Sequence, residues 1–157
     1  ALPSCQTVWG RNMLVDLKSD AKLIFDGYNA NPDSMKALIE NLSQVTTDGK
    51  KIVILGDMLE MGDQAEDLHK ELGEFVARRN FDVVWFLGQF AKSFEAGIKK
   101  GNFSKSILIS SSYEESLAIK VASMVEPSDI VVMKGSRGAR LEKLVPHFGP
   151  INWNPNK

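Results

Sequence analysis

The sequence predicts a three-layer α/β/α fold, in which a mostly parallel sheet carries an antiparallel edge strand. Five short apolar runs recur along the chain, each bounded by turn-forming residues, as expected of strands buried on both faces. The longer segments between them carry apolar residues at helical spacing. Strands that alternate with helices typically build a parallel sheet with helices on both faces, the Rossmann-like architecture. A chain of 157 residues, 43% of them hydrophobic, can bury one such core.

Residues 1–20 are expected to form an interdomain linker and the edge strand, over 13–17, before the first buried strand at 23–25. The helix after it has clear start signals. Asn31 fits the N-cap, because its side-chain oxygen can accept from free amides of the first turn, and Pro32 fits the first helical position. The apolar face of this helix is predicted to contain Met35, Leu38, Ile39, Leu42 and Val45.

The rest of the chain repeats this alternation up to residue 149, and a polar tail is expected over 150–157. Further strands are predicted over 52–55, 83–86, 107–109 and 130–133, and helices over 64–79, 89–99, 113–125 and 138–145. Asp63 and Glu66 resemble a capping box at the start of the second helix, and Arg78 and Arg79 are expected in its last turn. The domain is therefore expected to span residues 21–149.

Composition excludes several classes of function. A net charge of −1 gives no general electrostatic reason to bind nucleic acid or an anionic membrane. Cys5 is the only cysteine, which excludes a disulfide framework and agrees with a reducing, cytoplasmic location. His69 and His147 are too few for a three-histidine site, and no metal site is expected within this chain. No apolar run approaches the roughly 20 residues of a membrane span.

The first candidate binding site follows the strand at 23–25. Asp26, Tyr28, Asn29 and Asn31 lie at its carboxyl end, where open α/β sheets bind their ligands. They offer a carboxylate for hydroxyls, a ring for stacking and two amides for paired hydrogen bonds, which suits a nucleoside. Asp33 already complements the helix dipole and argues against a phosphate. The alternative is that the carboxylate and amides only satisfy backbone groups of the turn.

The second candidate is the basic segment after the strand at 130–133. Ser136 fits an N-cap, while Lys134, Arg137 and Arg140 crowd the positive end of the predicted helix, where cations are unfavourable. A bound anion between amides and cations would explain this arrangement, and we favour that interpretation. The alternative is that the cations face solvent or pair with Glu142 and Asp129.

Asp57, after the strand at 52–55, is a third candidate that could meet a metal-bound ligand or a basic group of a partner domain. The alternative, a solvated acidic loop, is favoured. His69 is expected on the surface of its helix, and His147 has no identifiable partner.

Absent motifs narrow the function further. The sequence has no Gly-x-x-x-x-Gly-Lys-[Ser/Thr] phosphate loop and no dinucleotide fingerprint after a strand, which disfavours a NAD-type oxidoreductase. A chain that binds a nucleoside at one turn and an anion at another, without a phosphate loop, looks like half of an active site. A stand-alone, non-catalytic nucleotide- or anion-binding module is the alternative.

Three segments, in this order, resemble the C-terminal domain of the Mur ligases: residues 26–35, 55–62 and 134–140. The resemblance covers roughly residues 21–148. Sibling ligases carry a histidine in the first segment, as in Asp-Tyr-Ala-His-Asn-Pro, whereas this chain has Asn29-Ala30-Asn31-Pro32 and no histidine. This difference favours the members that add D-alanyl-D-alanine, although Gly27 stands where they usually have Ser or Ala.

The resemblance implies the third domain of an ATP-dependent ligase that adds D-alanyl-D-alanine to UDP-N-acetylmuramoyl-tripeptide in peptidoglycan precursor synthesis. Its partners would be a UDP-sugar-binding domain and a central ATPase domain that holds the phosphate loop and most of the magnesium ligands, so this domain alone is predicted to be inactive. Asp26, Tyr28, Asn29 and Asn31 match the segment that faces the nucleotide. The segment near the dipeptide carboxylate or acyl phosphate is matched by Lys134, Ser136 and Arg137. Asp57 lies in the middle segment.

Overall fold

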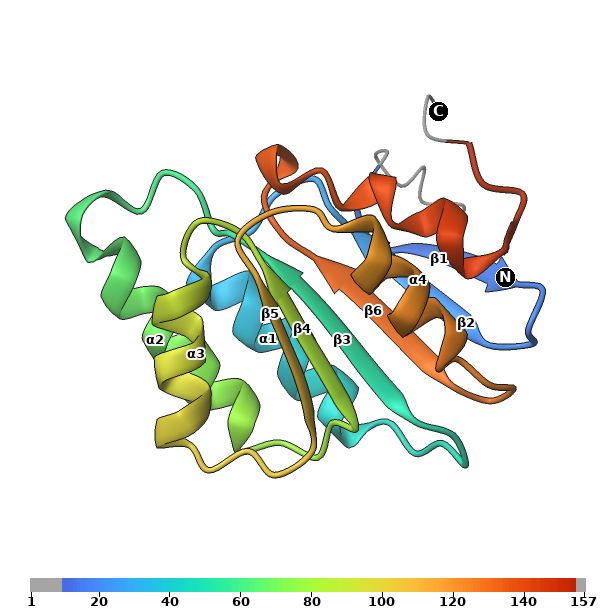
Figure 1. Cartoon of the computed structure of the whole chain (residues 1–157), viewed down its shortest axis with the longest axis horizontal. Helices are drawn as coiled ribbons and strands as arrows, with labels where there is room; N and C mark the ends of the chain where they lie inside the picture. The colour runs from blue at the N-terminus through green and yellow to red at the C-terminus, as the bar shows by residue number, and fades with distance from the viewer. Residues whose placement is uncertain (1–9, 155–157) are drawn as a thin grey trace, which may run out of the picture.

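The computed structural model describes residues 10–154, which form three layers around one sheet (Figure 1). The seven strands lie in the order β5-β4-β3-β6-β2-β1-β7. Their bounds are Met13–Leu17 (β1), Lys22–Asp26 (β2), Lys51–Gly56 (β3), Val83–Leu87 (β4), Ser106–Ser110 (β5), Ile130–Lys134 (β6) and Pro150–Ile151 (β7). Strands β2 to β6 pair in parallel, and β1 runs antiparallel to both β2 and β7. The predicted fold class is therefore confirmed.

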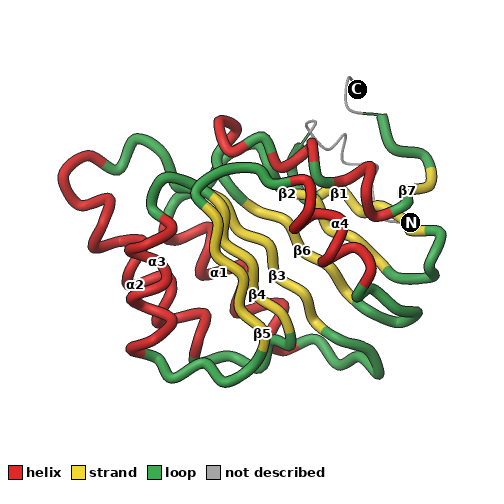
Figure 2. Tube along the Cα trace, viewed as in Figure 1, coloured by secondary structure: helices red, strands yellow, loops and turns green. Residues whose placement is uncertain are grey.

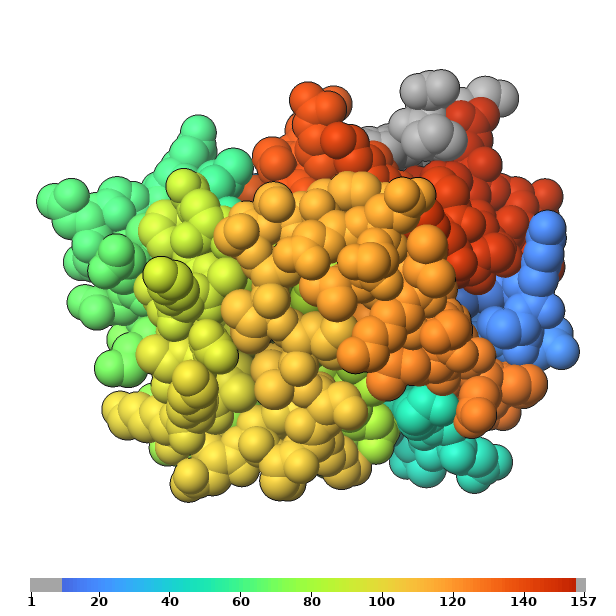
Figure 3. All heavy atoms as spheres, in the orientation of Figure 1, coloured from blue at the N-terminus to red at the C-terminus, as the bar shows by residue number. Residues whose placement is uncertain are grey.

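Helices cover both faces of the sheet (Figure 2). Their bounds are Pro32–Gln44 (α1), Ala65–Ala77 (α2), Ala91–Lys100 (α3) and Glu115–Ser123 (α4). Neighbouring side chains of a strand enter opposite cores: Trp85 packs with the layer of α4, and Phe86 packs with the layer of α1, α2 and α3. In the space-filling view, α2 and α3 lie at the left of the visible face, the segment around β5 in its centre, and α4 and the C-terminal segment at its right (Figure 3).

The start of α1 agrees with the prediction and adds a partner to it. Asn31 is the N-cap and its side chain accepts from the Ser34 N–H, while the Ser34 hydroxyl accepts from the Asn31 N–H, which completes a reciprocal capping box. Val45, predicted on the apolar face, is 42% exposed. It is the C-cap, and its extended backbone carries its side chain off the face that Met35 and Ile39 bury.

The capping box predicted for the second helix is wrong. A 3₁₀ turn, Gly62–Gln64, precedes α2, and neither Asp63 nor Gln64 provides a side-chain cap. The helix also ends at Ala77, so Arg78 and Arg79 lie past its last turn. Arg78 instead pairs with Glu74 one turn back along the chain, and Arg79 pairs with Glu40 of α1.

The helix predicted over 138–145 is also wrong. Three short 3₁₀ turns take its place, at Arg137–Ala139, Leu141–Lys143 and Val145–Phe148. Arg140 lies between the first two in the left-handed conformation, with φ 51°, which interrupts any continuous helix. Apolar residues of these turns, among them Leu141 and Val145, are fully buried against the sheet. The segment therefore keeps the helix-like spacing of its buried side chains, while its backbone makes the shorter 3₁₀ hydrogen bonds, such as that from the Leu144 N–H to the Leu141 carbonyl.

Part of the segment predicted as a polar tail forms a strand. Residues 150–151 form β7, and the Lys18 N–H donates to the Gly149 carbonyl beside it. The linker expected over residues 1–9 and the tail residues 155–157 lie outside the described residues, and the domain boundaries stay a prediction. Between residues 10 and 154, no helix is both long and apolar enough to cross a membrane.

Candidate functional site

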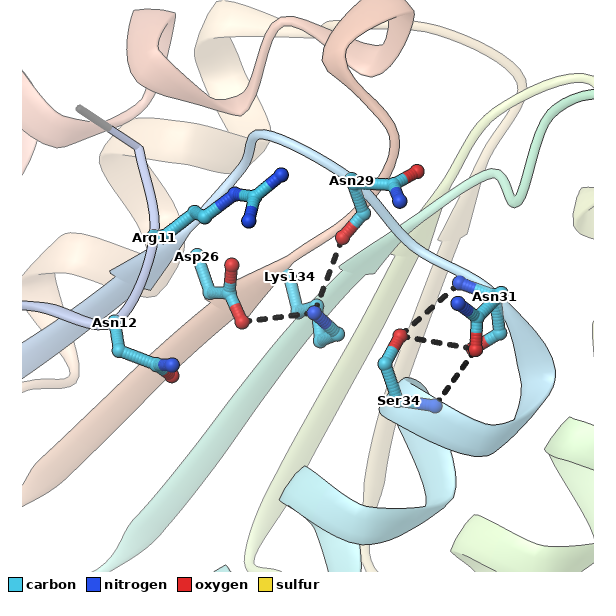
Figure 4. A pocket seen from close by; sticks show the side chains of 7 residues that line it. All are labelled: Arg11, Asn12, Asp26, Asn29, Asn31, Ser34 and Lys134. Atoms are coloured by element: carbon cyan, nitrogen blue, oxygen red, sulfur yellow. Dashed lines mark hydrogen bonds and ion pairs between the residues drawn. The ribbon is translucent and has the colours of Figure 1, made fainter. Parts of the chain in front are cut away.

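The carboxyl ends of β2 and β6 bring the first and second candidate segments together. These strands are parallel neighbours in which Asp26 and Lys134, the last residue of each, are register partners. Seven side chains line a cavity of about 180 Å³ at this rim (Figure 4): Arg11, Asn12, Asp26, Asn29, Asn31, Ser34 and Lys134. Parallel pairing thus makes one site from segments that are 108 residues apart in the sequence.

A buried ion pair forms the floor of this cavity. The Lys134 Nζ donates to the Asp26 Oδ2 at 2.8 Å and to the Asn29 carbonyl at 3.1 Å. The two side chains are only 4% and 11% exposed, so water competes weakly for their charges. The second carboxylate oxygen, Oδ1, has no hydrogen bond from any residue between 10 and 154 and can accept one from a ligand hydroxyl.

The two asparagines divide their side chains between the fold and the cavity. The Asn29 Oδ1 accepts from the Ala30 N–H at 2.9 Å, and the Asn31 Oδ1 accepts from the Ser34 N–H at 2.8 Å. The alternative that the asparagine side chains only satisfy backbone groups of the turn is therefore correct for their oxygens. Within the described residues their amide nitrogens have no hydrogen-bond partner, and both residues line the cavity. They can donate to a base or sugar.

Tyr28 connects this rim to Arg137. The Arg137 guanidinium carbon lies 5.6 Å from the Tyr28 ring centroid, and that of Arg11 lies 4.5 Å from it. The turn after β2, residues 26–31, and the basic segment therefore share one open surface. The same two contacts show that the Tyr28 ring, which was predicted to stack on a base, is already contacted by two guanidinium groups.

Arg11, Asn12 and Ser34 are cavity residues that the sequence interpretation missed. Arg11 and Asn12 precede β1, and only the antiparallel pairing of β1 with β2 brings them to the rim. Nothing local to residues 11 and 12 signals this position. Ser34 could have been found, because it stands three residues after the N-cap, where a side-chain oxygen can accept from the N-cap N–H; Glu or Gln more often takes this place.

Ser136 does not cap a helix, because it holds the loop after β3. Its Oγ accepts from the Leu59 N–H at 2.9 Å, and its own N–H donates to the Asp57 carbonyl at 2.9 Å. The residue is 6% exposed. Its hydroxyl hydrogen is still available to donate.

Asp57 is buried rather than part of a solvated loop. Its carboxylate accepts from the backbone N–H groups of Gln89 and Phe90 at 2.8 and 3.1 Å, at the start of α3. Gly88 leaves room for it, since a Cβ at this position would lie 2.3 Å from the Asp57 Oδ1. The carboxylate therefore compensates free amides at a helix start.

A second, larger cavity of about 410 Å³ lies beyond the basic segment, at the carboxyl ends of β3, β4 and β5. Arg140 and Lys143 contribute cations to its lining, and Gln89 and Tyr113 contribute polar groups. The Tyr113 hydroxyl lies 2.9 Å from the His147 Nε2, which supplies the partner that His147 lacked in the sequence. The basic segment thus separates two hollows on one rim.

The expectation that His69 is a surface residue is wrong. Its side chain is fully buried, its Nε2 accepts from the Met58 N–H at 2.9 Å, and its Nδ1 donates to the Ala65 carbonyl at 2.6 Å. The ring stacks on Phe90 with centroids 4.3 Å apart. Burial lowers the pKa of His69 because the charged ring would lose its hydration, and the hydrogen bond that Nε2 accepts also requires the neutral ring.

This burial predicts an acid-dependent loss of stability. The folded pKa of His69 is lowered, so a proton binds the unfolded chain preferentially, and stability is complete above the ordinary pKa of about 6.5 and falls below it. One such group changes the free energy of unfolding by at most about 1.4 kcal/mol per pH unit. In urea unfolding at pH 7.5 and 5.0, His69→Gln should lose less stability on acidification than the unchanged chain. His147→Gln, the control, should retain the full loss; equal losses in all three chains would contradict the prediction.

A metal site is not evident in this domain. Between residues 10 and 154, no cluster of three His, Cys, Asp or Glu side chains could hold an ion. The Asp26 carboxylate, the acid nearest the cavity, is already paired with Lys134.

Comparison with known proteins agrees with this geometry. The family model "Mur ligase, glutamate ligase domain" matches residues 10–137. The UDP-N-acetylmuramoyl-tripeptide–D-alanyl-D-alanine ligase of Bacillus subtilis (strain 168) is 35% identical over 132 residues, which are 84% of this chain and 29% of that protein.

Solved structures give the same result. The MurF ligase of Thermotoga maritima in complex with ADP has a TM-score of 0.70 and 30% identity, covering 92% of this chain and 31% of that one. A MurF structure from Acinetobacter baumannii has a TM-score of 0.76 and 28% identity, covering 91% and 31%. The chain thus spans about 30% of the length of these relatives. With a family model matching most of its length, a sheet of the predicted topology and the expected segments on one rim, the chain belongs to the Mur ligase family and represents its C-terminal, glutamate ligase domain.

Proposed function

We propose that this domain works in an ATP-dependent, cytoplasmic ligase that adds D-alanyl-D-alanine to UDP-N-acetylmuramoyl-tripeptide during peptidoglycan precursor synthesis. The Bacillus subtilis relative carries this activity in its name, and the Thermotoga maritima relative was solved with ADP. The observation that carries the proposal is the shared rim: the Asp26–Lys134 pair and the Arg137–Tyr28 contact join the nucleotide-type turn to the basic segment.

The proposed reaction has two steps. The γ-phosphoryl group of ATP passes to the tripeptide carboxylate, which gives an acyl phosphate and ADP. The dipeptide amine then attacks the acyl carbon, the new amide bond forms, and inorganic phosphate leaves with the electrons of the broken C–O bond. Magnesium, held mainly by the central domain, would neutralise phosphate charge.

The role of this chain is to position and enclose the reactants. The free Asp26 Oδ1 and the amides of Asn29 and Asn31 would bind the sugar and base, while Arg137 would meet the dipeptide carboxylate or the acyl phosphate. Closure of this domain over the central ATPase and UDP-sugar-binding domains would exclude water and align the amine. Ser136 and Asp57 would hold the loops that carry these groups.

Arg137→Ala in the full-length enzyme tests this function. We expect kcat/KM for D-alanyl-D-alanine to fall about tenfold or more, equivalent to about 1.4 kcal/mol, because a charge-assisted contact to an anion is lost. Ligation should be followed by product formation and phosphate release. Arg78→Ala, which removes a 61% exposed arginine at the C-terminal end of α2 that lines neither cavity of the rim, is the matched control and should leave kcat/KM unchanged. This chain alone should show no ATP turnover and no ligation. If kcat/KM is unchanged in Arg137→Ala, Arg137 does not contact the substrates.

A further inference from the structure

Lys134 is part of the basic segment in sequence, but its side chain contacts the turn after β2, residues 26–31. Both of its hydrogen-bond acceptors, the Asp26 carboxylate and the Asn29 carbonyl, lie in the turn after β2 (Figure 4). Its neighbours in sequence make different contacts: Ser136 binds the loop after β3, and Arg137 lies over the Tyr28 ring at the open surface of the turn. The basic segment is therefore three contacts with different purposes rather than one anion site.

The charge of Lys134 is already used. Both side chains are almost fully buried, and two of the three ammonium donors are taken by Asp26 and Asn29, so a substrate carboxylate that claimed the charge of Lys134 would compete with a buried Asp26 carboxylate for its partner. Breaking such a buried pair is strongly unfavourable. The ammonium instead holds one carboxylate oxygen of Asp26 and fixes the backbone of Asn29, the two groups whose remaining atoms line the cavity.

We propose that Lys134 is a positioning residue for the nucleotide side of the site, acting through Asp26 and Asn29, and that it does not bind the dipeptide. This inference rests on the proposed function for its substrates, and it departs from the role that the family resemblance implies for Lys134. Removing the ammonium should leave Asp26 and Asn29 wrongly oriented toward a ribose or base, whereas Arg137 keeps its place.

The test uses the full-length enzyme and the KM values of its separate substrates. Lys134→Met should raise KM for ATP at least tenfold and change KM for D-alanyl-D-alanine less than twofold, while Lys134→Arg should restore part of the loss. Asp26→Asn should also raise KM for ATP. Adding Lys134→Met to Asp26→Asn should raise it less than twofold further, since both changes break the same unit.

Lys51→Met is the matched control. Lys51 is 5% exposed, as buried as Lys134 at 3%, and its Nζ also donates to a backbone carbonyl, that of Ser43, but at the opposite end of the sheet. Lys51→Met should lower the free energy of unfolding without changing KM for ATP or KM for D-alanyl-D-alanine. If Lys134→Met does not fold, the KM values are measured instead on the double variant of Asp26→Asn and Lys134→Met, in which neither buried charge remains.

Three results would overturn the inference: a raised KM for D-alanyl-D-alanine with KM for ATP unchanged, independent multiplicative effects of the two substitutions, or equal effects of Lys134→Met and Lys51→Met. Calorimetric binding of ADP to the same variants gives a second readout that needs no ligation. If the unchanged enzyme fails to ligate D-alanyl-D-alanine, the proposed function fails, and weakened ADP binding in Lys134→Met still decides the role of Lys134.

Discussion

Replacing Gly97 by alanine should destabilise this domain by about 3 kcal/mol or more, although alanine favours an isolated helix by up to about 1 kcal/mol. Gly97 of α3 and Gly73 of α2 lie where the two helices touch. A Cβ at residue 97 would lie 1.9 Å from the Lys70 carbonyl oxygen and 2.8 Å from the Glu74 nitrogen. Both are backbone atoms, so no side-chain rotation can relieve the overlap. The helices would have to separate and open the core between them.

Urea unfolding of the chain measures this effect. Gly73→Ala, whose Cβ would lie 2.2 Å from the Phe94 carbonyl oxygen, should cost a similar amount. The double variant should cost less than the sum, because one separation of the helices relieves both overlaps. Gly62→Ala is the matched control. It has φ of +63° and no neighbour within 4 Å, so only the backbone penalty of about 1 kcal/mol applies. A neutral or stabilising Gly97→Ala would show that α2 and α3 do not pack this closely.

The second large effect is expected for Asp57→Ala, at about 3 kcal/mol. The substitution removes charge-assisted hydrogen bonds to the N–H groups of Gln89 and Phe90. Each is worth about 1.5 kcal/mol, the lower end of the range for a hydrogen bond to a charged group, because both bonds are only partly buried. Asp57→Asn keeps one acceptor oxygen and should lose about half as much.

The free energy of unfolding in urea and ligation by the full-length enzyme separate the two roles considered for Asp57. A structural role predicts that stability falls in step with lost hydrogen bonds. Asp63→Ala, an exposed acid of the same loop without a capping contact, should change stability by less than about 0.5 kcal/mol. If Asp57→Ala is as stable as this control yet abolishes ligation, Asp57 acts on the substrate and the interpretation as a helix-start anchor is wrong.

The elements that could be predicted from sequence are those whose signals are local. Strands β3 and β4 are buried on both faces, and their uninterrupted apolar runs predicted this. Asn31 and Pro32 signalled the start of α1 because a cap acts within one turn of the helix. The turn after β2 and the basic segment could each be located for the same reason: polar residues directly followed a predicted strand.

The elements that could not be predicted depend on contacts from distant parts of the chain. His69 stands among charged residues, and its burial depends on the Met58 N–H and the Phe90 ring. Residues 138–145 have helical spacing, yet the Ser136 Oγ accepts from the Leu59 N–H instead of capping a helix, and the turns that follow pack their apolar side chains on the sheet. In both cases a tertiary hydrogen bond or buried surface outweighed a local preference of a few tenths of a kcal/mol.

By itself, the sequence determined the alternation of strands and helices, the capped turn after β2 and the family to which the chain belongs, because these are written in residues close to one another. Only the tertiary structure decided that β6 lies beside β2, that Lys134 serves the turn of the other segment, and that Arg11 reaches the same rim. The physical reason is that the order of parallel strands is set by crossovers and core packing across the whole chain, and no short stretch of residues contains that information.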